Sequence, residues 1–247
     1  MANATRKAGR YGKALPQFPT GLKEFKAYLK QGAALPAPPA SVTKFRDVTA
    51  WPMFGNDQYG DCTMAAAAHA IQCWNAITAE KDRVPSDTAV VAEYFKLTGG
   101  ADSGLVESNV LQTWQKQGLW RNKIVAYAPI NVHDQTLLQQ AVDLYGLAYV
   151  GIQVPQNAET QFQDKQPWTL VQGWQTQTIV GGHAIPVVGY DQQYLYVITW
   201  GEVQQVAYDW WQTYGDEAWA IVPNEFKEAG GYQNINLQQL IADLQGI

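Results

Sequence analysis

Residues 55–70 read GNDQYGDCTMAAAAHA, a glycine-containing turn that leads directly into a run of alanines. Because alanine has the highest helix propensity, the run predicts a helix over about 61–79. Gly60 permits the turn before this helix, and Asp61 stands at its N-cap position. Cys62 therefore lies at the mouth of the helix, where the positive helix end and unpaired backbone N–H groups favour the reactive thiolate.

The second cysteine lies in the middle of the same helix. Cys73 follows Cys62 by eleven residues, which is too far along one helix for a disulfide and is typical of a small buried hydrophobic residue. The chain has two cysteines and three histidines, without the paired spacing of a structural zinc site. We therefore expect no metal and no cofactor.

Length and composition indicate one large domain. The chain has 247 residues, of which 47% are hydrophobic and 16% charged, with a formal net charge of −5; this length allows a substantial core. No apolar run reaches the roughly 18 residues of a membrane span, and residues 1–16 contain no apolar stretch typical of a secretory signal. We expect no membrane partner and a cytoplasmic or virion-associated location.

Helical patterns come before strand patterns along the chain. After the first helix, apolar spacing and cap residues predict helices over about 86–97, 107–117 and 134–145. The sequence then changes to short β-branched and aromatic runs separated by turn residues, and a last helix is expected from 236. This segregation implies an α+β fold. The predicted strands cover 147–154, 184–190, 194–199, 203–208 and 218–222.

Residues 181–191, GGHAIPVVGYD, place His183 at the start of a strand after two glycines. A histidine there can present its imidazole at a cleft between a sheet and a helix; the alternative is a buried structural histidine. His69 lies two turns after Cys62, roughly 10 Å along the helix, which is too far for it to serve as the base of that thiol. His133 precedes the fourth helix and is expected at the surface or in a cap.

Taken together, these segments resemble the papain-like cysteine peptidases in both motif and order, over about residues 35–222. The resemblance implies a helical half followed by an antiparallel β half, with an active-site cleft between them. It divides the chain into an N-terminal arm (1–34), a papain-like domain (35–225) and a C-terminal extension with a short helix (226–247). The segments that carry it are LPAPPASVTKFRDV (35–48), GNDQYGDCTMAAAAHA (55–70), LTGG (97–100) with VLQTWQKQGL (110–119), LLQQAVDLYGLAYVGIQV (137–154), GGHAIPVVGYD (181–191) and YLYVITWGEVQQVAYDWW (194–211) with DEAWAIV (216–222).

The resemblance also implies a reaction. Cys62 would be the nucleophile and His183 its general base, in a peptidase or related amide hydrolase that acts on a peptide or protein substrate. The backbone N–H of Cys62 and a side-chain amide would form the oxyanion hole. Asp61 opposes the thiolate by its charge unless its side chain caps the helix.

Two positions depart from the family pattern. The family's oxyanion glutamine lies six residues before the cysteine, where this sequence has Asn56, whereas Gln58 lies four residues before it; both are candidates. The family's histidine-orienting asparagine falls on Ile198, which cannot hold an imidazole tautomer by hydrogen bonding. With a shift of one residue, Thr199 could accept a weaker bond. Trp200 matches the family's tryptophan, which shields the histidine from water.

The N-terminal arm is basic. Residues 1–30 carry seven Lys and Arg and one Glu, a charge of +6, against −11 for the rest, and the two sum to −5. Such an arm suggests docking on an acidic capsid or nucleic-acid surface, and a solvated tail is the other interpretation. We expect a short helix between Thr20 and Gly32 and few residues in the core. The arm is also too short and too basic to resemble the family's inhibitory prodomain.

Two functions therefore remain open. The order of Cys62 and His183 favours a papain-like cysteine peptidase. The basic arm and the missing asparagine suit a catalytically inert papain-like module with a structural or binding role, for example a phage-encoded, virion-associated protein.

Overall fold

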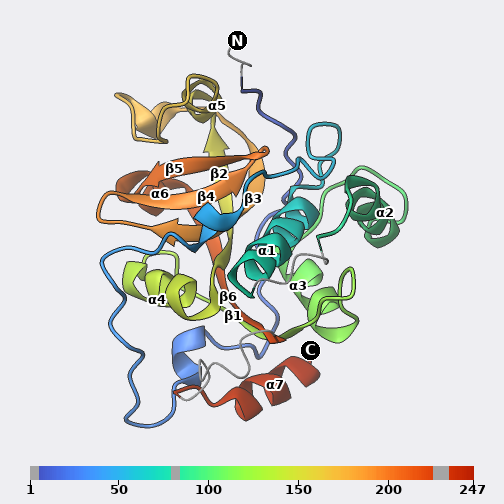
Figure 1. Ribbon diagram of the computed structural model, residues 1–247, viewed down its shortest axis with the longest axis vertical. Helices are drawn as coiled ribbons and strands as arrows, with labels where there is room; N and C mark the ends of the chain where they lie inside the picture. Colours follow the sequence, from blue (N-terminus) through green and yellow to red (C-terminus); the bar gives the residue numbers. More distant parts are fainter. Residues whose placement is uncertain (1–5, 79–83, 225–233) are drawn as a thin grey trace.

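The computed structural model describes residues 6–78, 84–224 and 234–247. Its elements divide into a helical half and a six-stranded sheet (Figure 1). The strand order is β1-β6-β2-β3-β4-β5, and each neighbouring pair is antiparallel. The predicted α+β class with an antiparallel β half is confirmed. Within the described residues, no helix is both long enough and apolar enough to cross a membrane.

The helical half is built around α1 (Cys62–Thr78), at the place where the alanine run predicts it. The alanines of its first half are buried, and their small side chains let α1 pack closely against β3 (Ile179–Tyr190). The predicted cap at Ser86 is observed, because its side chain accepts a backbone N–H, and Asp134 caps the helix that follows it in the same way. The other helices are α2 (Asp87–Leu97), α3 (Glu107–Lys116), α4 (Gln135–Tyr145), α5 (Gln156–Gln163), α6 (Tyr208–Tyr214), α7 (Leu237–Gln245) and the 3-10 turns η1 (Phe25–Tyr28), η2 (Lys44–Asp47) and η4 (Trp174–Thr176).

The β half contains every predicted strand and one more. The additional strand, β1 (Ile124–Pro129), lies between α3 and α4 in sequence and pairs with β6 at the edge of the sheet, so the order of helices before strands is not strict. The predicted hairpin of β3 and β4 is confirmed, with the Asp191 carboxylate accepting two backbone N–H groups in its turn. The remaining strands are β2 (Ala148–Pro155), β4 (Tyr194–Thr199), β5 (Glu202–Ala207) and β6 (Gly215–Pro223).

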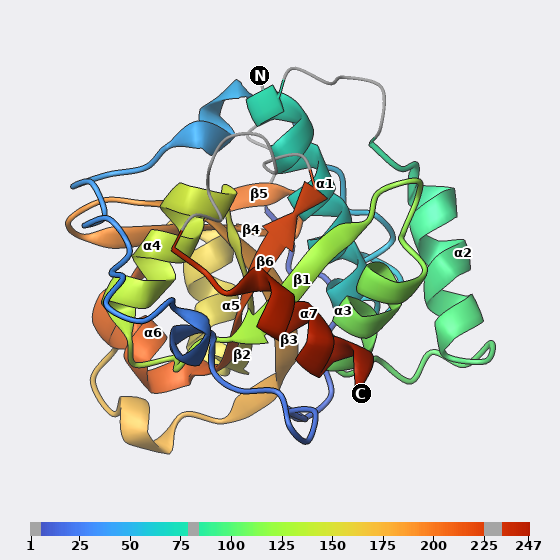
Figure 2. The same ribbon diagram turned by 90° about the horizontal axis from the view of Figure 1, so that it is seen from below.

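The second half of the N-terminal arm belongs to the core. Phe25 and Tyr28 are fully buried, and the Tyr28 hydroxyl donates a hydrogen bond of 2.8 Å to Asp243. Helix α7 lies beside η1 and across the end of β1 (Figure 2). The expectation that the arm contributes little to the core is therefore wrong, because two aromatic side chains anchor it under the last helix.

The arm differs from the prediction in its secondary structure as well. The helix expected between Thr20 and Gly32 is only the 3-10 turn η1. Residues 1–5 of the arm, Ala79 at the end of the predicted first helix and residues 226–233 of the predicted extension lie outside the described residues. The closing helix is observed as α7, with Asn236 as its cap.

Candidate active site

Cys62 is the first residue of α1, and its side chain is buried at the junction of the two halves. It lines a small cavity of about 10 Å³ together with residues of β3, β4 and the loop before α1. A volume of this size holds at most about one water molecule. The residues that share the cavity with Cys62 include four others predicted for the site or for its shielding, which are His183, Thr199, Asn56 and Trp200.

His183 lies in β3, where it pairs with Ile152 of β2. Its Nε2 atom is 2.8 Å from the Thr199 hydroxyl oxygen, while its Nδ1 atom is buried without a hydrogen-bond partner among the described residues. When Nε2 carries the proton and donates it to Thr199, Nδ1 keeps a free lone pair. The imidazole is therefore arranged to accept a proton at Nδ1, in the cavity that it shares with Cys62.

The end of β4 supplies the polar partner of the imidazole. Thr199 is buried and is the last residue of β4. Its neighbour Ile198, at the position of the family's asparagine, is also buried and pairs with Val203 of β5. Trp200 follows with a positive φ of 47°, and its ring lies 5.0 Å from the His183 ring at an interplanar angle of 31°. The structure thus places a hydroxyl and a shielding indole on the histidine, as predicted, although their catalytic roles stay predictions.

The two oxyanion candidates lie in different places. Asn56 is buried and lines the cavity of Cys62, whereas Gln58 is exposed and lines an outer groove. The Asn56 amide donates hydrogen bonds to the carbonyl oxygens of Arg10, at 3.1 Å, and Tyr59, at 3.2 Å. Of the two candidates, Asn56 is therefore the one that lies at Cys62, and in this structure its amide is bound to two peptide carbonyls.

Burial dominates the electrostatics of the site. It raises the pKa of Cys62 to about 12, and the nearby Asp61 carboxyl raises it further. Burial also lowers the pKa of His183 to about 3 and raises the pKa of Asp61 to about 7. The helix mouth was expected to favour the thiolate form of Cys62. That expectation is wrong for this structure, in which the thiol is buried, because desolvation outweighs the helix dipole.

The cover over the site is residues 6–14, which we name the cleft segment. In Figure 1 this part of the chain descends between α1 and β3. On the helical side, the Arg10 N–H donates to the Asn56 carbonyl at 2.7 Å, and the Leu105 N–H donates to the Gly12 carbonyl at 2.9 Å. On the side of the sheet, the Lys13 N–H donates to the Gly182 carbonyl of β3 at 3.1 Å. The cleft segment is therefore bound by its backbone to both walls of the cleft.

Glycines allow this close approach. A Cβ atom on Gly12 would lie 1.7 Å from the Gly60 carbonyl oxygen, and a Cβ on Gly9 would lie 2.5 Å from the Asn56 carbonyl oxygen. The Gly12 backbone also lies near enough to the Cys62 thiol to act on its pKa, which it lowers. The cleft segment consequently touches the predicted nucleophile itself.

The groove around the cleft segment has a volume of about 520 Å³. Asp102 holds the helical wall of the groove in place, since the Asp102 carboxylate accepts hydrogen bonds from the Gly60 N–H at 2.9 Å and from the Tyr94 hydroxyl at 2.7 Å.

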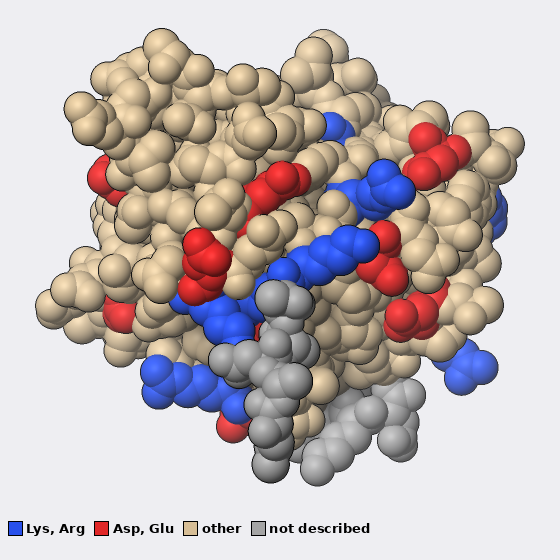
Figure 3. Space-filling model, turned by 90° about the horizontal axis from the view of Figure 1, so that it is seen from above, with Lys and Arg blue, Asp and Glu red and all other residues tan. Residues whose placement is uncertain are grey.

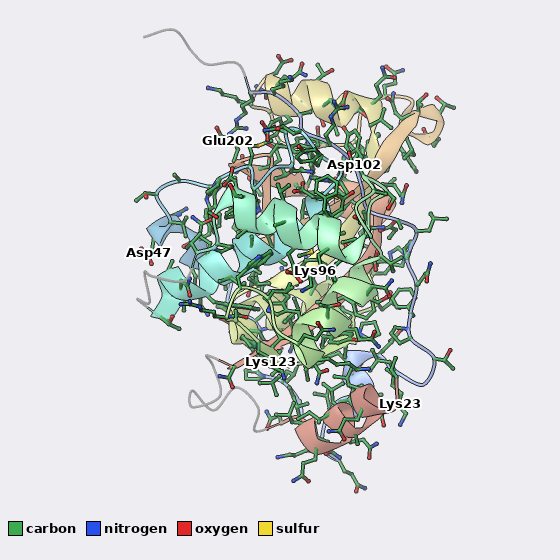
Figure 4. The ribbon with its side chains drawn as sticks, turned by 90° about the vertical axis from the view of Figure 1, so that its right-hand side faces the viewer. Lys23, Asp47, Lys96, Asp102, Lys123 and Glu202 are labelled. Carbon is green, nitrogen blue, oxygen red and sulfur yellow. The ribbon has the colours of Figure 1, made fainter. Side chains whose placement is uncertain are left out.

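Figure 4 shows Asp102 towards the same end of the molecule as Glu202. Arg6 pairs with Glu202 at 3.3 Å. On the face seen in Figure 3, basic and acidic side chains are interleaved.

The remaining histidines have structural partners. His69 lines the cavity of Cys62, but its Nε2 atom is 2.8 Å from the Pro52 carbonyl oxygen and must donate to it. Burial lowers the pKa of His69 to about 4. His133 is exposed, as expected, with Nδ1 2.7 Å from the Gln212 amide oxygen. Within the described residues, no group of three or more His, Cys, Asp or Glu side chains is arranged to hold a metal ion.

A charged cluster beside the cleft escaped the sequence analysis. The side chain of Lys13 is fully buried, with Nζ 3.0 Å from both Asp216 Oδ2 and Glu217 Oε1. Glu107 at the start of α3 is also fully buried and interacts electrostatically with Lys13 and Glu217. The sequence gives only a weak signal of this cluster. Asp216 and Glu217 precede the apolar run of β6, and Glu107 is the first residue of α3.

These features define the papain-like fold: a helical half that carries Cys62, a β half that carries His183, and a cleft between them. Among solved structures, the chain is similar to xylellain, a cysteine protease from Xylella fastidiosa, with a TM-score of 0.67, 16% identity, and coverage of 90% of this chain and 99% of that one. It is also similar to digestive procathepsin L 3 of Tenebrio molitor, with a TM-score of 0.54, 15% identity, and coverage of 88% and 76%. The cysteine protease of Carica candamarcensis gives a TM-score of 0.54 at 15% identity, covering 75% and 99%. No protein-family model and no curated protein sequence matches the chain.

Proposed function

We propose that this protein is a cysteine peptidase of the papain-like type, with Cys62 as nucleophile and His183 as general base. The observation that carries the proposal is the state of the imidazole. Its Nε2 is held by Thr199 at 2.8 Å, its Nδ1 is unpartnered among the described residues, and both residues line one cavity with the thiol. The similar solved structures are cysteine proteases by name, which supports the same chemistry.

The reaction follows from this arrangement. His183 Nδ1 takes the thiol proton, and the Cys62 sulfur attacks the substrate carbonyl carbon, so that a C–S bond forms. The oxyanion receives hydrogen bonds from the Asn56 amide and the Cys62 backbone N–H. The imidazolium then gives its proton to the departing amine as the C–N bond breaks, and water hydrolyses the thioester in the reverse sequence of proton transfers.

The cleft segment keeps the enzyme in a covered state. It lies where an extended peptide would bind, it occupies the amide of Asn56 with the Arg10 carbonyl, and it excludes water from Cys62. Because a desolvated thiol and a desolvated imidazole are both neutral, the ion pair needed for attack forms only when the segment moves away. The activity of the intact chain is therefore low until the cleft segment is displaced.

The test is hydrolysis by a full-length chain with a displaced segment. Gly12→Ala forces the segment away from the Gly60 carbonyl, so this variant cleaves an unfolded protein substrate faster than the parent chain. Adding Cys62→Ala abolishes that cleavage. The matched control is Lys7→Ala, which changes an exposed residue of the same segment and leaves the rate at the parent level. Absence of hydrolysis in Gly12→Ala, with the fold intact, would contradict the proposal and favour the inert module.

A further inference from the structure

The buried cluster around Lys13 has more negative than positive charge. Three carboxyl groups, those of Glu107, Asp216 and Glu217, surround one ammonium group; we name these three acids the acidic chamber. Lys13 Nζ donates hydrogen bonds of 3.0 Å to Asp216 and 3.1 Å to the Ala14 carbonyl, and it forms an ion pair of 3.0 Å with Glu217. The ammonium group thus donates two hydrogen bonds, and its contact with Glu217 is electrostatic.

The chamber is costly to keep ionised unless it has a cationic occupant. Both carboxyl oxygens of Glu107 are buried without a hydrogen-bond partner among the described residues, and the side chain of Glu217 is also fully buried. Burial and the neighbouring carboxyl groups raise the pKa of Glu107 well above its usual value and also raise that of Glu217, whereas the charge of Lys13 acts to lower both. A cation in the chamber therefore favours the charged forms of these acids.

The floor of the chamber is shaped for an unbranched chain. Gly151 of β2 lies beneath the lysine stem, and a Cβ atom at this position would be 2.0 Å from Lys13 Cε and 2.7 Å from Glu217 Cγ. Glycine in the interior of a strand weakens the sheet unless another group approaches the backbone closely. Here the approaching group is the methylene chain of the lysine.

The chamber opens beside the nucleophile. The backbone of Gly12 lies near enough to the Cys62 thiol to lower its pKa, and the next residue, Lys13, donates its N–H to the carbonyl of Gly182, directly before His183. A peptide held between Leu105 and Gly182 by its backbone thus inserts one side chain into the chamber. Backbone hydrogen bonds of this kind bind any extended peptide, so that side-chain pockets provide the selectivity.

We propose that the acidic chamber is the specificity pocket of the enzyme and selects peptide substrates with a lysine next to the residue that lies over Cys62. Lys13 of the cleft segment is the chain's own occupant of this pocket. The inference rests on the proposed peptidase function. It adds the class of substrate: basic, lysine-containing segments of proteins.

The first experiment maps cleavage sites. The full-length double variant Gly12→Ala/Lys13→Ala empties the chamber, and its digest of an unfolded protein mixture is analysed by mass spectrometry. Lysine is then enriched at one fixed position relative to the scissile bond. In peptides that differ only there, kcat/KM for lysine exceeds that for norleucine by at least about tenfold. Cleavage without such enrichment, or a preference for norleucine, would overturn the inference.

Two acid-to-amide variants identify the residues responsible. Glu217→Gln, added to the double variant, lowers kcat/KM for the lysine peptide by at least about tenfold and leaves the norleucine peptide within about threefold. The matched control Asp164→Asn changes an exposed acid at the end of α5 and leaves both substrates unchanged. Equal losses for both peptides in Glu217→Gln would show a structural role only.

A binding measurement separates this inference from the proposed function. The double variant with Cys62→Ala is titrated with a fluorescent hexapeptide of residues 10–15, RYGKAL, and with its norleucine analogue. The lysine peptide binds at least about tenfold more tightly, and Glu217→Gln removes the difference. If this preference is found but no hydrolysis occurs, the peptidase function fails and the lysine pocket stands. Equal affinities, or no detectable binding of either peptide, would overturn the pocket.

Discussion

At the residue scale, we expect the orientation of His183 to depend on Thr199. Its hydroxyl is the observed partner of Nε2, at 2.8 Å, and it takes the place that the family gives to an asparagine one residue earlier. A hydroxyl fixes the imidazole through a single short bond, whereas Ile198 beside it is committed to packing in the sheet. The hydrogen bond between Thr199 and His183 is therefore a local contact. We expect its removal to lower the rate of hydrolysis more than the stability of the fold.

Thr199→Val tests this role in the Gly12→Ala background. Valine keeps the β-branched shape but leaves Nε2 without its partner, so we expect kcat to fall about 10- to 100-fold. The free energy of unfolding falls by no more than about 1–3 kcal/mol, the cost of one unsatisfied buried group. Thr199→Ser keeps the hydroxyl and retains the activity. A Thr199→Val variant with full kcat would assign the orientation of His183 to another group.

His69 gives a pH-dependent prediction at the same scale. Burial lowers its pKa from 6.5 to about 4, so the unfolded chain binds a proton below pH 6.5 that the folded chain does not. The stability due to neutral His69 is complete above pH 6.5 and is lost as the pH falls towards 4. His69→Gln keeps a donor for the Pro52 carbonyl but cannot titrate.

The destabilisation caused by His69→Gln therefore shrinks as the pH falls from 6.5 to 4.5, by about 1.4 kcal/mol per pH unit. Urea unfolding of the parent protein and of His69→Gln at several pH values measures this change in the difference between their free energies of unfolding. A difference that is constant over this range would show that His69 is protonated in the folded state.

At the scale of elements, the contrast within the N-terminal arm is informative. Phe25 and Phe18 are both isolated aromatic residues in a basic, proline-containing stretch, yet Phe25 is fully buried and Phe18 is 52% exposed. The difference arises from α7 and β1, which cover η1 and lie about one hundred residues or more further along the chain. Local sequence contains no sign of it.

Truncating each phenylalanine measures the contribution of η1. Phe25→Ala lowers the free energy of unfolding by about 3–5 kcal/mol, as expected for a large aromatic side chain removed from a core. Phe18→Ala is the control and costs less than about 1 kcal/mol. Thermal or denaturant melts of the two full-length variants give the comparison. Similar small effects would mean that the arm is a solvated tail after all.

Prediction from the sequence succeeded where the signal is local. The alanine run and the cap Ser86 specify helices through propensity and through hydrogen bonds to the first turn. The helices predicted to start at Asp134 and Asn236 are also observed, and the side chains of these residues cap them. The alternating runs of the β half specify strands in the same way. Strand β1 was missed because its six residues become a strand only by pairing with β6.

The residues predicted around Cys62 share one cavity in the structure, but their buried environment was not predicted from the sequence. The positions of Cys62 and His183 follow from motifs, but the pKa of Cys62 depends on desolvation by the cleft segment, which approaches from fifty residues away in sequence. The acidic chamber and its occupant bring together residues 107, 216 and 217 with residue 13. Only tertiary packing brings these four positions together.

At the scale of the whole molecule, the basic arm pairs with acids of its own chain. Arg6 lies against Glu202 and Lys13 against Asp216 and Glu217, so part of the charge asymmetry noted in the sequence is satisfied internally. Docking on a capsid or nucleic-acid surface, and a phage origin, stay predictions. What the structure shows instead is a segment bound across the cleft of a papain-like fold.

The central claim is that residues 6–14 cover a Cys62–His183 pair that is otherwise reactive, and thiol labelling tests it most directly. Full-length parent and Gly12→Ala proteins are treated with iodoacetamide at pH 7 without denaturant, and the alkylation of each cysteine is followed by mass spectrometry. In the parent, both thiols are buried with pKa values raised to about 12, so both react slowly. In Gly12→Ala, we expect labelling of Cys62 to accelerate by at least about tenfold while Cys73, the internal control, stays protected. Unchanged labelling of Cys62, or equal acceleration at both cysteines, would contradict the account.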